Sequence, residues 1–109
     1  MLNIVSSSRY KVSKKYLRGI ILKWLDEQRI PADRVINIIF VGKNKMRTIA
    51  SKYKNENEAL PVLSFNYEDK LGEVFICYPQ AVLLAAERDK RVNDMLVRLI
   101  KHGVGNLIK

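Results

Sequence analysis

The strongest constraint on the fold is an apolar segment in the first half of the chain, residues 34–41, which reads RVINIIFV. β-Branched residues dominate this segment, and Gly42 follows it directly. A short, nearly continuous apolar run of this kind is typical of a strand that is buried on both faces of a sheet. We therefore expect residues 35–40 to form a central strand that helices cover on both sides.

Four amphipathic helices are predicted around this strand. Behind Ser13, a residue type that favours a helix start, apolar residues recur with helical spacing and predict a helix to about residue 28. A second helix is predicted from about residue 45 to 54, and a third, which Pro79 suits in its first turn, to about residue 88. A fourth begins after residue 91, and Gly103 and Gly105 weaken its predicted end.

The remaining apolar segments predict short strands at residues 2–6, 62–67 and 73–77, with a hairpin turn at residues 68–72. The element order is then β-α-β-α-β-β-α-α, an α+β fold with a four-stranded mixed sheet packed with helices. Because helical connections usually join parallel strands, we expect the first three strands to be parallel and the last one antiparallel. A chain of 109 residues, 48% hydrophobic, fits a single domain over residues 1–109.

Positive charge is concentrated in the first half of the chain. Residues 1–54 hold 13 Lys and Arg against 3 Asp and Glu, whereas residues 55–109 hold 7 against 8, which together give the net charge of +9. A basic half of this kind favours a polyanionic partner such as RNA. The alternative is a solvated surface that aids solubility. The candidate RNA-binding residues are Lys14, Lys15, Arg18, Lys45, Arg47, Lys52 and Lys54.

Several classes of protein are disfavoured by the same sequence. No segment approaches the roughly 18 apolar residues of a membrane span, and residues 1–10 lack the apolar core of a secretion signal. Cys77 is the single cysteine, so an internal disulfide is impossible and a buried thiol is expected. We therefore expect a cytoplasmic protein with no membrane partner.

His102 is the one histidine in the sequence, and it stands near the end of the fourth predicted helix. Two histidines at positions i and i+4 of a helix can converge on one metal ion, but position 106 is Asn106, a poor zinc ligand. A histidine near a helix C-terminus is also favoured by the helix dipole without any metal. Ser64 shows no sign of nucleophilic activation, because the sequence contains no G-x-S-x-G motif.

Three segments, taken in order, resemble the YbeY family of bacterial rRNA maturation factors: NIIFVGKNKMRTIASKYKN, VLSFNYEDKLGEVFIC and LVRLIKHG. The family pattern runs roughly Y-R-G-K-D-x-P-T-D-V-L-S-F, then G-[DE]-[IV]-x-I, then H-G-x-L-H-x-x-G-Y-D-H. The resemblance extends from about residue 5 to 103. It implies rRNA or the small ribosomal subunit as partner, zinc as the family's metal, and metal-dependent cleavage of single-stranded RNA as the family's activity.

The resemblance also assigns candidate site residues. The first metal histidine of the family falls on His102, the second on Asn106, and the third beyond Lys109, so the resemblance predicts a domain that is C-terminally incomplete relative to the family. Lys54 stands where the family has Arg, and Ser64 is retained. Both are therefore candidate catalytic residues.

Two functional hypotheses follow from these assignments. In the first, the protein is a YbeY-like RNA-binding factor in rRNA maturation or ribosome assembly, with metal-dependent catalysis impaired or lost and no tightly bound zinc. In the alternative, it is an active metal-dependent single-strand endoribonuclease. A protease-like zinc hydrolase ranks last, because Gly103 stands where such enzymes carry a glutamate base.

Overall fold

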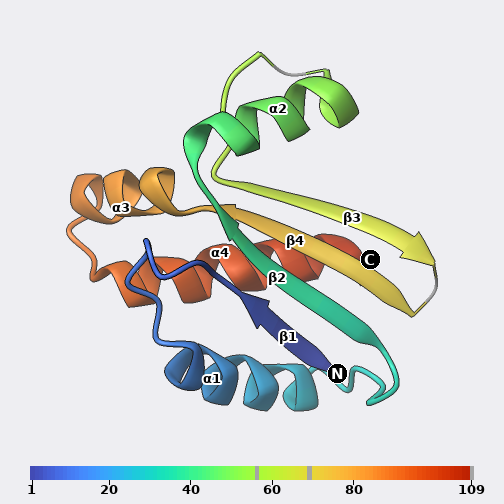
Figure 1. Ribbon diagram of the computed structural model, residues 1–109. Coiled ribbons are helices and arrows are strands. Elements are labelled where there is room, and N and C mark those ends of the chain that lie inside the picture. Colours follow the sequence, from blue (N-terminus) through green and yellow to red (C-terminus); the bar gives the residue numbers. More distant parts are fainter. Residues whose placement is uncertain (56, 69, 109) are drawn as a thin grey trace.

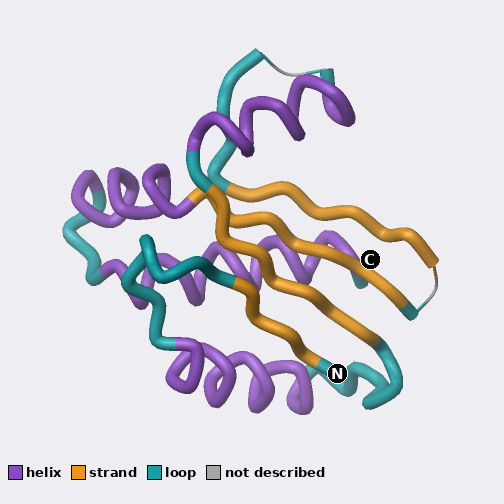
Figure 2. Tube along the Cα trace, in the orientation of Figure 1, coloured by secondary structure: helices purple, strands orange, loops and turns teal. Residues whose placement is uncertain are grey.

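The computed structural model describes residues 1–55, 57–68 and 70–108 as a single layered body (Figures 1 and 2). The predicted element order is confirmed. The elements are β1 (Leu2–Val5), α1 (Lys14–Glu27), β2 (Val35–Val41), α2 (Lys43–Lys54), β3 (Val62–Glu68), β4 (Leu71–Cys77), α3 (Tyr78–Glu87) and α4 (Val92–Leu107). Asp69 of the predicted hairpin turn and Lys109 lie outside the described residues.

The four strands form one sheet in the order β1-β2-β4-β3, so β2 is central, as its sequence predicts. β1, β2 and β4 run parallel, and β3 pairs antiparallel with β4 at the edge. The expectation that residues 62–67 form the third parallel strand is therefore wrong. The hairpin places β4 beside β2, and this pushes β3 outward with the opposite direction.

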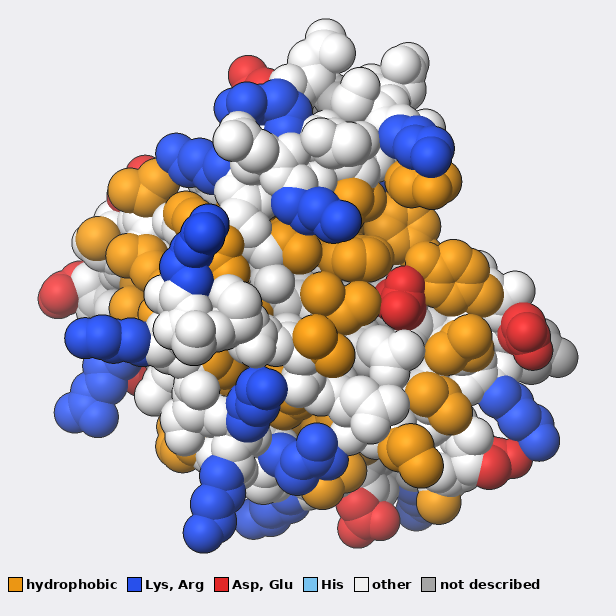
Figure 3. Space-filling model, in the orientation of Figure 1, with side chains coloured by type: hydrophobic (Ala, Val, Ile, Leu, Met, Phe, Trp, Pro, Cys, Tyr) orange, Lys and Arg blue, Asp and Glu red, His pale blue; other side chains and the backbone are white. Residues whose placement is uncertain are grey.

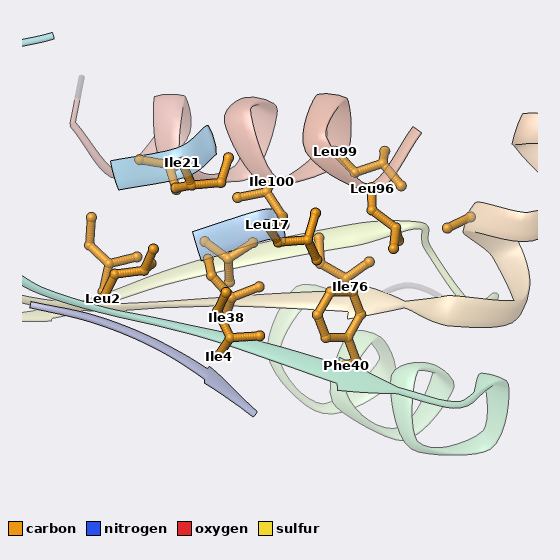
Figure 4. Packing of buried hydrophobic residues seen from close by; sticks show 14 of the residues in the cluster. Leu2, Ile4, Leu17, Ile21, Ile38, Phe40, Ile76, Leu96, Leu99 and Ile100 are labelled. Carbon is orange, nitrogen blue, oxygen red and sulfur yellow. The ribbon is translucent and has the colours of Figure 1, made fainter. Parts of the chain in front are cut away.

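The main core lies between one face of the sheet and the helices α1, α3 and α4 (Figure 4). Alternate residues of β2 point to this side, so Ile36, Ile38 and Phe40 are buried against it. The helices contribute their apolar stripes, including Leu17 and Ile21 of α1. None of the helices described is long and apolar enough to cross a membrane.

The other face of the sheet is covered only in part. α2 packs over its upper end, where Met46, Ile49 and Ala50 meet Val41 and Leu63. Figure 4 shows α2 on the side of the sheet opposite α4. Below α2 this face is open, and it faces the viewer in Figure 3. The expectation that the central strand is covered on both faces therefore holds only near its C-terminal end.

A chain of polar side chains crosses this open face from one edge of the sheet to the other. Asn3 of β1 donates to Asn37 of β2 (2.8 Å), and the amide of Asn37 lies 3.5 Å from the carboxylate of Glu73 on β4. Tyr67 of β3 donates its hydroxyl to the same carboxylate at 2.8 Å. Asn37, the polar residue within β2, lies in the middle of this row of hydrogen-bonded side chains.

α4 runs without interruption through both of its glycines and ends at Leu107. The two glycines that were expected to weaken its end therefore do not terminate the helix. Gly103 is buried against β3 and β4, and this packing outweighs the low helix propensity of glycine.

Candidate functional site around His102

A cleft of about 360 Å³ opens beside His102, between the start of β3 and the helices α3 and α4. Its floor is apolar and includes Val62 and Met95. Its polar lining consists of Arg88, which follows α3, and of Arg98 and His102, which lie one helical turn apart on α4. Among the described residues, Asp and Glu do not line this cleft.

Gly103 fixes the distance between His102 and the sheet. A Cβ atom at position 103 would lie 2.4 Å from Val74 Cγ1 and 3.0 Å from Val62 Cγ2, so only glycine lets α4 approach this closely. Ser64 of β3 donates its hydroxyl to the carbonyl of Gly103 at 2.7 Å. This bond joins the edge strand to the helix directly beside His102.

The C-terminal end of α4 is anchored as well. The carbonyl of Leu107 accepts hydrogen bonds from the Arg34 guanidinium and from the Asn66 amide, both at 3.0 Å. Arg34 also donates to the side-chain oxygen of Asn66. A helix end leaves its last carbonyls without helical partners, and these two side chains satisfy one of them. The helix that carries His102 is therefore held at both strands of the hairpin and at the start of β2.

The donor atoms near His102 do not fit a zinc ion. Asn106, one turn further along α4, is exposed and offers an amide in place of an imidazole. Nowhere in residues 1–55, 57–68 and 70–108 do three or more His, Cys, Asp or Glu side chains gather in a way that could hold a metal. A catalytic zinc usually takes three protein ligands, whereas this cleft supplies one histidine and two permanent cations.

The predicted cations of α2 are exposed on the two flanks of this helix. Lys45, Arg47, Lys52 and Lys54 are all exposed, and they surround the outer side of the helix. Lys54 holds its ammonium 5.2 Å from the ring centre of Phe65. The ammonium of Lys52 lies 5.3 Å from the ring centre of Tyr53.

The cations of α1 do not join those of α2. α1 packs on the main-core side of the sheet and α2 on the opposite side, so the seven predicted RNA-binding residues do not form a single face. Lys14 and Lys15 are exposed. Arg18 donates a hydrogen bond to the carbonyl of Leu2 at 2.7 Å, which satisfies a backbone acceptor of the edge strand β1.

The two candidate catalytic residues are not brought together either. Ser64 points toward α4, whereas Lys54 lies over Phe65, the next residue of β3, which points to the opposite face. Cys77 is fully buried, as predicted, and burial raises the pKa of its thiol.

Sequence reasoning missed Arg88 and Arg98. Both belong to the half of the chain whose net charge is near zero, so the charge count gave no reason to select them. Arg98 could have been found by its spacing, because it stands four residues before His102 and so shares its helix face. Arg88 reaches the cleft only through the packing of α3 on α4.

Comparison with known proteins assigns this arrangement to a family. The family described as "Endoribonuclease YbeY" matches residues 3–108. A protein of that name from Thermodesulfovibrio yellowstonii is 31% identical over 111 residues, covering 95% of this chain and 66% of that protein. One from Dehalococcoides mccartyi strain CBDB1 is 29% identical over 129 residues, covering 98% and 78%.

A solved structure supports the fold. The solution structure of a Thermotoga maritima protein superimposes with a TM-score of 0.66 at 19% identity, covering 95% of this chain and 69% of that one. The chain thus spans about two thirds to four fifths of the length of these relatives. Since the family match spans residues 3–108, which include every element of the fold and the His102 cleft, this chain belongs to the YbeY family.

Proposed function

We propose that this protein binds RNA in rRNA maturation or assembly of the small ribosomal subunit, in the cytoplasm, and that metal-dependent catalysis is impaired or lost in it. Its relatives carry the name endoribonuclease, which supports RNA as the ligand. The chemistry of its own cleft supports binding without a metal.

The observation that carries this proposal is the cationic lining of the cleft. Arg88, Arg98 and His102 line one side of an open cleft in which no described carboxylate competes for them. Arginine presents planar, permanently charged N–H donors that match phosphate oxygens. The cleft therefore binds a phosphodiester where a metal site would instead need carboxylates and imidazoles.

The α2 cations supply a second set of phosphate contacts. Lys45, Arg47, Lys52 and Lys54 are exposed on the opposite side of β3, the edge strand. A single strand of RNA that crosses this edge reaches both sets. Phosphate contacts carry no sequence information, so affinity for many RNA sequences is expected.

The alternative function is metal-dependent cleavage of single-stranded RNA, with Lys54 stabilising charge on the phosphate and Ser64 donating a hydrogen bond. The family name favours it. The donor set around His102 weighs against it, and so does the bond that commits the Ser64 hydroxyl to Gly103.

Replacing Arg88 and Arg98 with Gln is expected to weaken RNA binding and reduce its dependence on salt. Each phosphate neutralised on a single strand contributes about 0.7 to the slope of log affinity against log salt. Loss of two contacts should thus flatten the slope by about 1.4. Fluorescence anisotropy with a labelled single-stranded oligonucleotide, from 50 to about 300 mM salt, measures this slope.

Two further variants test whether the cations of α2 and of α1 also contact the RNA. Replacing the four α2 cations with Gln should flatten the slope by about two to three units. The pair Lys14→Gln/Lys15→Gln makes the same charge change on α1, which packs on the same side of the sheet as α3 and α4, and it tests α1 separately from the cleft. An unchanged slope in the cleft variant contradicts the proposal, and so does a parent protein that fails to bind RNA at low salt.

Zinc content provides an independent prediction. We expect the purified 109-residue protein to carry far less than one zinc per chain, because one histidine and one amide form too weak a site. Elemental analysis of the parent and of His102→Ala measures this directly. Near-stoichiometric zinc that disappears in His102→Ala, together with chelator-sensitive RNA cleavage, would favour the endoribonuclease alternative.

A further inference from the structure

A second cavity lies on the far side of β3 from His102, in the angle between α2 and the open face of the sheet. It has a volume of about 310 Å³ and is lined by Lys45, Ile49, Tyr53, Phe65, Tyr67 and Phe75. We call it the aromatic groove. In Figure 3 the hydrophobic side chains over β3 and β4 lie below the Lys and Arg side chains of α2.

The aromatic rings of this groove are arranged edge to face. Tyr53 and Phe65 have ring centres 5.6 Å apart at an interplanar angle of 73°, and Phe65 and Phe75 are 5.8 Å apart at 79°. Tyr53 is 60% exposed and Tyr67 56% exposed. Two tyrosines at the mouth of the groove thus offer ring surface to solvent above a base of two phenylalanines.

Positive charge lies at the rim of the groove. Lys45 lines it, and the ammonium groups of Lys52 and Lys54 lie over the rings of Tyr53 and Phe65. Glu73 of β4 accepts hydrogen bonds from the groove residue Tyr67 and from Asn37. The bond to Glu73, with some burial, raises the pKa of Tyr67 to about 12, so its ring stays uncharged.

We propose that the aromatic groove binds unpaired bases of single-stranded RNA, with Tyr53 and Tyr67 as the stacking surfaces and the α2 lysines on the adjacent phosphates. The inference rests on the proposed RNA-binding function and adds the way in which the strand is held. Aromatic rings beside a positively charged track are the common design of proteins that bind single strands.

The lysines that now lie over these rings do not prevent stacking. A base stacked on an aromatic side chain contributes more to the binding free energy than a cation that lies over an exposed ring. A lysine that leaves the ring for a phosphate keeps an electrostatic partner. Exchange of the ammonium for a base is therefore favourable.

Charge complementarity favours RNA over a protein partner as the occupant. The rim carries three lysines, and the carboxylate of Glu73 already accepts hydrogen bonds from Tyr67 and Asn37. A groove that served an apolar segment of another protein would not need this rim. RNA matches both the aromatic rings and the lysine rim, because its bases are flat and apolar on their faces and its backbone is anionic.

The test compares a single-stranded oligonucleotide with an abasic strand of the same length and charge. The parent is expected to bind the oligonucleotide more tightly, and Tyr53→Leu and Tyr67→Leu should each lower its affinity roughly five- to hundredfold. Neither variant should change affinity for the abasic strand or the salt slope. Tyr53→Phe and Tyr67→Phe, which keep the ring, should bind like the parent.

The matched control is Tyr16→Leu on α1, a tyrosine that is 43% exposed and lies far from the groove. Circular dichroism and thermal unfolding of every variant show that the fold is retained. If oligonucleotide and abasic strand bind equally in the parent, the groove inference is overturned while the proposed function stands. The groove inference is also overturned if Tyr16→Leu loses as much affinity for the oligonucleotide as Tyr53→Leu and Tyr67→Leu do. Absence of binding to either strand at low salt overturns the proposed function itself.

Discussion

Replacing Gly103 with Ala is expected to destabilise the protein by about 1–3 kcal/mol, although alanine is the better helix former by about 1 kcal/mol. The added Cβ atom would lie 2.4 Å from Val74 Cγ1, and Val74 is fully buried on β4. A β-branched side chain in a sheet cannot swing aside, so α4 must move outward. That movement stretches the bond between Ser64 and the Gly103 carbonyl.

Urea denaturation of Gly103→Ala measures the decrease in the free energy of unfolding. Gly103→Val should decrease it further. Gly105→Ala is the matched control, because a Cβ at that position meets nothing within 4 Å. The gain in helix propensity then acts alone, and Gly105→Ala should stabilise the protein by up to about 1 kcal/mol. Equal effects of the two alanine substitutions would contradict a packing role for Gly103.

The second large effect is expected at Ile38. This residue is fully buried in the main core, on the central strand. Truncating a buried isoleucine to alanine leaves a cavity and costs about 2–5 kcal/mol. A domain of this size is stable by only about 5–15 kcal/mol in total, so Ile38→Ala should lower both the thermal midpoint and the urea midpoint markedly.

Ile39→Ala is its neighbouring control. Ile39 points to the other face of the sheet, where it is only partly buried beside the α2 cluster. The same truncation there should cost on the order of 1 kcal/mol, because less apolar area is lost from the interior. If Ile39→Ala proved as damaging as Ile38→Ala, the assignment of the main core to one face would be wrong.

These two isoleucines also show how far the sequence could go. The run RVINIIFV was enough to predict a central strand, because short apolar β-branched segments have few other stable environments. It could not show which face was covered. That depends on where α2 packs, and α2 reaches only the end of the strand, beside Val41. Asn37, whose side chain lies on the open face, is the polar residue within β2.

The direction of β3 was predicted wrongly for a related reason. A helix between two strands usually returns the chain to a parallel neighbour, and this holds for the connection from β1 to β2. From β2 through α2 the chain instead reaches the far edge, and only the tight hairpin brings β4 back beside β2. Local patterns define the hairpin but not which of its two strands pairs inward.

Only some of the candidate residues could be selected from the sequence, and their functional roles remain predictions. Lys54, Ser64, His102 and Asn106 came from short motifs that a sequence displays directly. Arg88, Arg98 and the rings of the aromatic groove come from separate elements, and tertiary packing alone brings them together. Charge counts over half the chain could not separate the α1 cations from the α2 cations, because helix placement on a sheet is not a local property.

The dependence of the main core on α4 has a consequence for the nascent chain. The face of the sheet formed by β1, β2 and β4 is covered by six residues of α4: Met95, Leu96, Leu99, Ile100, Val104 and Leu107. Until residues 92–107 leave the translating ribosome, Ile36 and Ile38 on that face lack much of their cover. Exposed apolar strands of this kind aggregate or recruit chaperones. Because α4 follows every strand in the sequence, the main core can be completed only after residues 92–107 are outside the ribosome.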